Sequence, residues 1–200
     1  MIIGALLFAI LLAVVIAAYQ FITRFSVRTP NEVFPFLLSI DMEALSATFH
    51  VEVEEYFRAC LSPQEFKKMQ WKRIHLAIHY CNMVSNNSRV LLGWTKYERG
   101  EKWEMLDSDL QNAVLSLRNI CARCRLSSFV IRFRLRWWLV RMELLPFSQA
   151  PTFKTLLGLG SADMISFYGN ARLLAEAFSR VYGEGYHQKF AQALSYAHAA

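Results

Sequence analysis

The first 23 residues of the chain contain no charged side chain. From Ile2 to Tyr19 the residues are all apolar or small, so a helix formed by them has no polar face of the kind that a soluble domain would show. At about 1.5 Å per residue such a helix measures roughly 34 Å, which is enough to cross a hydrocarbon core of about 30 Å. We therefore predict a transmembrane signal-anchor helix over residues 1–25.

A cleaved secretory signal peptide is the alternative for this segment. Signal peptides begin with basic residues and have a shorter apolar core, of about 7–15 residues, whereas no basic side chain precedes the apolar run here. Arg24 and Arg28 follow the run, and the positive-inside rule then places the N-terminus outside and the C-terminal domain in the cytoplasm. The four cysteines are too few for a disulfide scaffold, which agrees with a reducing compartment.

The predicted anchor carries alanine at every fourth position, at Ala5, Ala9, Ala13 and Ala17. On a helix these residues form a smooth stripe, which allows two backbones to approach closely in lipid. The stripe predicts packing against another membrane protein or against a second copy of the chain. The alternative is that alanine is simply common in membrane helices.

The rest of the chain has the composition of a helical domain. The whole chain has only 8 glycines and 5 prolines, and long stretches rich in Leu, Ala, Arg, Glu and Met predict helices. We interpret residues 26–40 as a linker or interfacial segment and residues 41–200 as one helical domain. The expected fold is all-α, with one N-terminal transmembrane helix followed by a bundle of about five helices. The helices are expected over residues 41–60, 62–98, from 103–109 to 145, 161–182, and from 186 toward the C-terminus, with a possible break at 127–129.

One helix start is marked with particular clarity. Ser62, Pro63 and Glu65 stand in the order of a capping box, in which Ser62 caps the helix, Pro63 occupies the first helical position and Glu65 reaches back. Further along this helix, Arg73 falls among apolar residues on the helical wheel. Its guanidinium either pairs with an acid of the preceding helix, for which Glu52, Glu54 and Glu55 are the candidates, or extends to the surface.

A run of arginines is the strongest signal in the domain. Between Leu110 and Met142 there is no acid and no lysine, yet seven arginines occur: Arg118, Arg123, Arg125, Arg132, Arg134, Arg136 and Arg141. On a helix they form two stripes, and the large apolar residues between them are Phe129, Ile131, Phe133, Trp137, Trp138 and Leu139. Arginine without lysine favours bidentate recognition of carboxylate or phosphate.

Three interpretations of this run remain open. The stretch from Thr29 to Glu65 has seven acids and one arginine, a net charge of −6, and could pair with the run inside the bundle. The run could instead face anionic lipid headgroups, or bind a partner such as an acidic protein surface. Nucleic acid is not expected as a partner, because the sequence contains no recognisable nucleic-acid-binding module. The candidate residues for an anionic surface or partner are Arg118, Arg125, Arg132, Arg134, Arg136 and Arg141.

Two further pairs have the spacing of metal ligands. His75 and His79 lie four residues apart on one helix face, but Leu76 stands where a zinc protease needs glutamate. Cys121 and Cys124 are separated by two residues, but the second pair of a structural zinc site is missing. These four residues are weak candidates, and we expect no catalytic residue, no cofactor and no metal.

These observations predict a non-enzymatic, single-pass membrane protein, an accessory or scaffold subunit that binds membrane lipid and another membrane protein. The first alternative is a metal- or redox-dependent enzyme that uses His75, His79, Cys121 and Cys124. The second is a peripheral module that binds anionic lipid through the arginine run.

Overall fold

A computed structural model of the chain describes residues 29–144, 151–154 and 161–194. Within these ranges the secondary structure is entirely helical, which confirms the all-α prediction for this part of the chain. The predicted anchor over residues 1–25, with its alanine stripe at Ala5, Ala9, Ala13 and Ala17, lies outside the described residues. Among the helices that are described, none has both the length and the hydropathy needed to traverse a bilayer.

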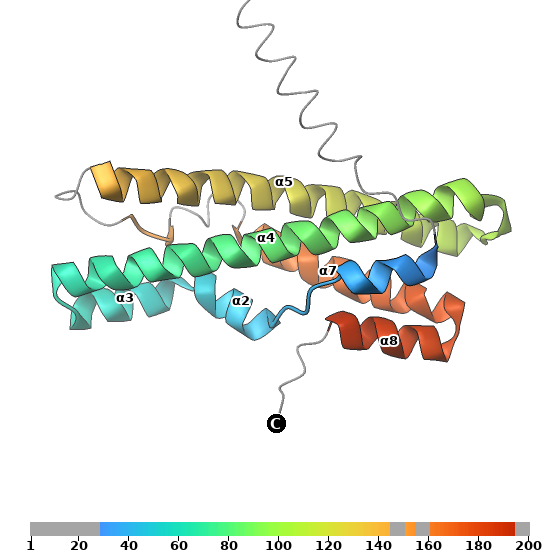
Figure 1. The fold of residues 1–200 in the computed structure, drawn as a ribbon, viewed down its shortest axis with the longest axis horizontal. Helices are drawn as coiled ribbons and strands as arrows, with labels where there is room; N and C mark the ends of the chain where they lie inside the picture. The colour runs from blue at the N-terminus through green and yellow to red at the C-terminus, as the bar shows by residue number, and fades with distance from the viewer. Residues whose placement is uncertain (1–28, 145–150, 155–160, 195–200) are drawn as a thin grey trace, which may run out of the picture.

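A long helical hairpin forms the frame of the domain. Helix α4 (Pro63–Glu101) and helix α5 (Ser108–Leu144) run antiparallel and side by side, joined through the short 3-10 helix η2 (Trp103–Met105) (Figure 1). The predicted capping box is confirmed: Ser62 Oγ accepts a bond from the Glu65 amide, and Glu65 Oε2 accepts one from the Ser62 amide at 3.1 Å. Helix α5 continues through residues 127–129, so the possible break there is absent.

Helix α7 (Ser161–Ser179) packs along α5, and helix α8 (Glu184–Leu194) turns back against α7. The turn between them consists of the 3-10 helix η3 (Arg180–Tyr182) and Gly183. Gly183 has a φ of 93°, which a side chain would strain, so glycine suits the sharp end of η3. The 3-10 helix η1 (Pro30–Phe36), whose Val33 is wholly buried, packs on α4 and also contacts α8.

The acidic segment before α4 forms two helices rather than the single one predicted over residues 41–60. Helix α2 (Met42–Phe49) begins at Asp41, whose carboxylate accepts bonds from the amides of Glu43 and Ala44, and helix α3 (Val51–Cys60) follows after an extended His50. Arg73 of α4 explains the interruption. It donates Nε–H to the carbonyl of Thr48 at 2.9 Å and Nη2–H to the carbonyl of His50.

Arg73 therefore neither extends to the surface nor forms an ion pair. An unbroken helix would need the Thr48 and His50 carbonyls for its own amides, so the buried guanidinium ends α2 at this point. The same guanidinium lies 4.3 Å from the ring centre of Phe153. Burial lowers the pKa of Arg73, and the charge of Glu54 partly opposes that effect.

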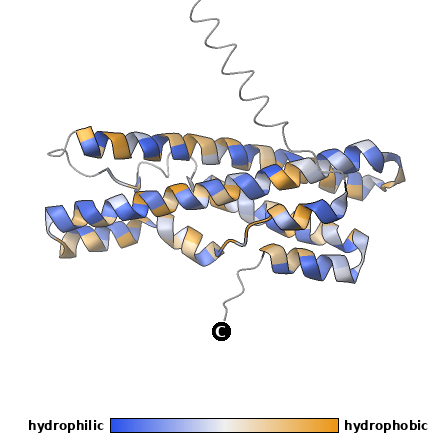
Figure 2. Cartoon of the chain, in the orientation of Figure 1, coloured by the Kyte–Doolittle hydropathy of each residue, from blue (hydrophilic) through white to orange (hydrophobic). Residues whose placement is uncertain are grey.

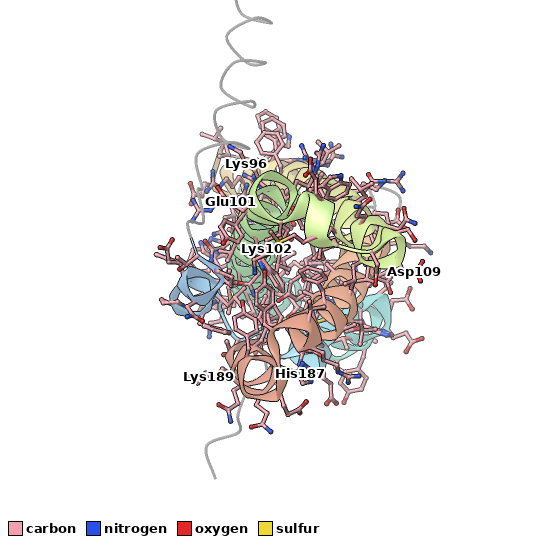
Figure 3. All side chains as sticks on the ribbon, turned by 90° about the vertical axis from the view of Figure 1, so that its right-hand side faces the viewer. Lys96, Glu101, Lys102, Asp109, His187 and Lys189 are labelled. Carbon is pink, nitrogen blue, oxygen red and sulfur yellow. The ribbon has the colours of Figure 1, made fainter. Side chains whose placement is uncertain are left out.

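The buried apolar side chains of the described residues form two clusters. The first lies at the middle of the bundle, around Ile74 and Cys81 of α4, Ile131 and Leu135 of α5, and Tyr168 of α7. The second lies toward the α4–α5 turn, where Trp94 packs among the rings of Phe178, Tyr182, Tyr186 and Phe190. Figure 3 looks onto this end of the bundle, where Lys102 lies between the α4–α5 turn and α8. Its Nζ is 4.4 Å from the ring centre of Tyr182.

Asn87 connects three elements at the junction of these clusters. Its Oδ1 accepts a bond from the Leu38 amide at 2.8 Å, while its Nδ2 donates to the Leu38 carbonyl at 2.6 Å and to the Tyr168 hydroxyl at 2.7 Å. The side chain is fully buried. It therefore fixes the segment before α2 onto α4 and α7.

Replacement of Asn87 by alanine should lower the free energy of unfolding by about 2–3 kcal/mol, because Leu38 and Tyr168 would keep buried polar groups without partners. Urea denaturation of the full chain in mild detergent, followed by far-UV circular dichroism, measures the change. Asn119→Ala is the matched control, since Asn119 is an exposed asparagine inside α5 and should change stability by roughly 0.5 kcal/mol or less. Equal effects of the two substitutions would contradict the role given to Asn87.

Candidate functional site

An apolar stripe runs along the outward face of α5. Helix α5 forms one long edge of the body (Figure 1), and hydrophobic positions recur along its length (Figure 2). Phe133 is 68% exposed and Trp137 is 57% exposed, although both are large hydrophobic side chains. The complete set, which we call the outer stripe, is Leu126, Phe129, Val130, Phe133, Trp137, Val140 and Leu144.

The spacing of the outer stripe makes it one continuous surface. At about 100° per residue all seven side chains lie within roughly 60° of the direction of Phe133. From Leu126 to Leu144 the stripe is about 27 Å long at 1.5 Å per residue. A contiguous apolar surface of this kind is unusual on a soluble monomer and marks a contact site for a protein or a membrane.

Arginines border the outer stripe on both sides. On the same helical wheel Arg123, Arg134 and Arg141 fall about 80–100° to one side of Phe133, and Arg118, Arg125, Arg132 and Arg136 fall about 60–100° to the other. Arg118, Arg123, Arg134, Arg136 and Arg141 are exposed, whereas Arg132 is half-buried and Arg125 is only 5% exposed. The face therefore combines an apolar centre with cationic edges.

The acidic segment does not pair with this face. Helices α2 and α3 pack on α4, and α2 also touches α7. The ion pairs found in residues 29–144, 151–154 and 161–194 join Arg58 to Glu54 at 3.2 Å and Arg172 to Glu176 at 2.8 Å, with a longer contact between His50 and Glu52. None of these involves Arg118, Arg123, Arg132, Arg134, Arg136 or Arg141. For these six arginines the intramolecular interpretation of the charge pattern is wrong, because α2 and α3 do not lie along α5.

Two arginines of α5 face α4 and help to enclose a hollow between the helices. Its volume is about 160 Å³, and its lining, which we call the arginine pocket, is Asn82, Ser85, Asn86, Arg89, Arg125 and Arg132. No carboxylate lines it. The pocket therefore gathers three guanidinium groups with neutral amide and hydroxyl side chains.

Hydrogen bonds hold two of these guanidiniums at the pocket. Arg132 Nη1 donates to Asn82 Oδ1 at 2.8 Å, and Arg89 Nη2 donates to Asn86 Oδ1 at 2.9 Å. Asn86 is in turn held by its own bond to the Phe36 carbonyl at 2.8 Å. Burial, together with the positive charges of Arg89 and Arg132, lowers the pKa of Arg125 to about 10. A negative ion in the pocket would offset both effects.

The two metal-ligand pairs do not come together. His75 and His79 are exposed on α4, where the ring of His75 lies 3.9 Å from that of Trp71. Cys121 and Cys124 are fully buried on α5, in the second and first cluster respectively. In the part of the chain that the structure describes, no group of three or more His, Cys, Asp or Glu side chains is arranged to hold a metal ion.

The buried thiols have the properties of core residues. Burial raises the pKa of Cys81 to about 12 and that of Cys124 to about 11, and it raises the pKa of Cys121 as well. A thiol in this state is a poor nucleophile and a poor metal ligand at neutral pH. The remaining cysteine, Cys60, is exposed.

The sequence identified the arginines of α5 but missed their partners. Asn82, Asn86 and Arg89 belong to α4, and only the packing of the two helices brings them to the arginine pocket. Within the outer stripe, Leu126, Val130, Val140 and Leu144 were also missed. The spacing of these apolar residues around Phe133 was a signal that could have revealed them.

Comparisons with known proteins give no relative. No family model, no curated protein and no solved structure matches the chain significantly.

Proposed function

We propose that the chain is a membrane-anchored helical scaffold that acts by binding rather than by catalysis, and that it lays the outer stripe of α5 against an anionic membrane surface. The observation that carries the proposal is the exposed apolar stripe with arginines on both edges. An interfacial helix buries such an apolar face roughly 5–10 Å into the boundary between headgroups and acyl chains. Phe and Trp suit that depth, and the flanking arginines then lie at the level of the phosphates.

The charge of the face favours lipid over an apolar protein groove. Each basic residue near an anionic leaflet contributes about 1 kcal/mol, and five arginines beside the stripe are exposed. Between Leu110 and Met142 no acid weakens this attraction. The uncharged segment at residues 1–23 provides independent support, because a predicted anchor there would keep the domain beside a membrane.

A dye placed on the outer stripe tests the proposal. We expect an environment-sensitive nitrobenzoxadiazole dye at Phe133→Cys, in a Cys60→Ser background, to enter lipid when the full chain is reconstituted with vesicles containing phosphatidylserine. The same dye at Leu173→Cys is the matched control, since Leu173 is 65% exposed on α7. Quenching by an aqueous quencher measures the difference. If position 133 is protected equally in neutral vesicles or in detergent alone, the lipid contact is contradicted and a protein occupant is indicated.

The arginines should determine how strongly the face binds. The triple variant R134Q/R136Q/R141Q should need markedly more phosphatidylserine for the same protection at position 133, because it loses about 3 kcal/mol of attraction. Its control is the triple variant of Lys68, Lys72 and Lys96 to glutamine, which removes the same charge from exposed positions of α4. Equal effects of the two triple variants would mean that only the overall charge matters, and would contradict a specific role for α5.

A further inference from the structure

The arginine pocket has the features of a site for a doubly charged anion. Three guanidiniums from two helices border one hollow of about 160 Å³, a space for roughly five water molecules. Each guanidinium presents a planar fork of donors that matches the oxygens of a phosphate group. The lining supplies no carboxylate that would compete for them.

The neutral residues of the pocket position the cationic ones. Asn82 and Asn86 accept bonds from Arg132 and Arg89, and Asn86 is itself tied to the backbone of η1. These bonds pre-arrange the side chains before any ligand arrives, which reduces the entropy lost on binding. Ser85 adds a hydroxyl that can donate to a phosphate oxygen.

We propose that the arginine pocket binds a phosphate monoester group, held between Arg89, Arg125 and Arg132. Such a group carries close to two negative charges at neutral pH, so it balances a cluster of three guanidiniums better than a carboxylate would. Two sources share this chemistry: a lipid headgroup that ends in a phosphate monoester, and a free phosphate compound. The proposal does not depend on the outer stripe, because the pocket lies between α4 and α5 rather than on the exposed face.

The mutual position of the arginines supports the proposal independently. Burial and the two neighbouring cations make the charge on Arg125 unfavourable in the unliganded protein. An anion bound between the three guanidiniums would offset this mutual repulsion.

Thermal denaturation of the full chain in mild detergent provides the first arm of the test. Inorganic phosphate should raise the melting temperature more than sodium chloride of equal ionic strength does. R125M should lose the response to phosphate, because it removes the most deeply buried guanidinium of the pocket. R132Q is the second pocket variant and should weaken the apparent affinity roughly tenfold or more. R180Q is the control, because Arg180 is exposed on η3 and lies neither in the pocket nor beside the outer stripe.

Vesicles provide the second arm and separate the two sources. Vesicles containing phosphatidic acid have a phosphate monoester headgroup, and their binding is compared with that of vesicles containing phosphatidylserine at equal surface charge. Preference for phosphatidic acid that R125M and R132Q abolish, without a response to inorganic phosphate, assigns the site to lipid. A response to inorganic phosphate that the same variants abolish assigns it to a free phosphate compound. The proposal is overturned if neither probe acts, or if R180Q loses as much affinity as the pocket variants.

Discussion

Replacement of Arg73 by methionine should lower the free energy of unfolding by about 3–5 kcal/mol, the largest effect that we expect from a single substitution. The guanidinium of Arg73 is buried and donates to the carbonyls of Thr48 and His50. Methionine would fill much of the space but would leave both carbonyls without their donor at the end of α2. Unpaired buried groups of this kind, and the loss of charged hydrogen bonds, have costs of this order.

The same substitution removes a contact with a distant segment. Arg73 lies over the ring of Phe153, whose amide donates to Glu54 Oε2 at 2.7 Å. Without Arg73 the charge of Glu54 loses a nearby cation in a buried position. The damage should therefore extend from α2 to residues 151–154.

Urea denaturation of the full chain, followed by circular dichroism, measures the effect of the Arg73→Met substitution. Lys72→Met is the matched control, because Lys72 is the exposed neighbour on the same helix and should change stability by about 0.5 kcal/mol or less. Arg73→Lys should lie between the two, since an ammonium keeps the charge but lacks the planar fork. A loss below about 1 kcal/mol in Arg73→Met would show that the two carbonyls do not depend on this side chain.

The helices around Arg73 also show which structural features could be predicted from the sequence and which could not. The start of α4 could be predicted because its determinants, Ser62, Pro63 and Glu65, lie within four consecutive positions and act on each other directly. The break at His50 could not be predicted in this way. Its cause lies 23 residues further along the chain, in a side chain whose position depends on how α4 packs against α2.

The candidate site likewise has some features that local sequence determines and others that tertiary packing determines. The two arginine stripes of α5 follow from helical periodicity alone, so the sequence could place them. Periodicity did not reveal which aromatic residues lie outside: Phe133 and Trp137 are exposed, whereas Trp138 is buried in the first cluster beside the ring of Phe153. Likewise, the arginine pocket depends on the register of α4 against α5, which places Asn82 beside Arg132 across 50 residues. The burial of Trp138 and the assembly of the arginine pocket arise from tertiary packing, whereas the spacing of the outer stripe was already present in the sequence.

The second large effect should appear at alkaline pH, where the domain should lose about 3 kcal/mol of stability per pH unit above pH 9. The thiols of Cys81, Cys121 and Cys124 have an ordinary pKa of 9.0, and burial raises the pKa of each in the folded domain. Below pH 9 all three are protonated whether the chain is folded or not, so they have no influence. Above pH 9 the unfolded chain releases these protons and the folded chain retains them, which favours unfolding. Each thiol then contributes about 1 kcal/mol per pH unit.

Each thiol lowers the stability only up to the pH at which it ionises in the folded domain as well, and this pH differs among the three. Cys124, whose pKa lies at about 11, begins to ionise in the folded state first, and Cys81 follows at about 12. The phenols of Tyr168, Tyr182 and Tyr186 extend the effect above pH 10, because burial raises the pKa of each. Hydrogen bonding to the carboxylate of Glu98 adds to the shift of Tyr182. The steepest loss should therefore begin near pH 9.5 and continue beyond pH 10.5.

Urea denaturation at half-unit steps from pH 8 to pH 10.5, with a reductant present, measures this slope in the full chain. The double variant C121A/C124A should be less stable at pH 8, because it leaves small cavities, yet its stability should fall about 2 kcal/mol less per pH unit above pH 9. Cys60→Ala is the matched control: Cys60 is exposed, so its removal should leave the slope unchanged. Because the comparison concerns slopes, the cavities affect every pH equally and do not enter the result. If the double variant and the parent chain lose stability in parallel, the three thiols are not what limits the fold at high pH.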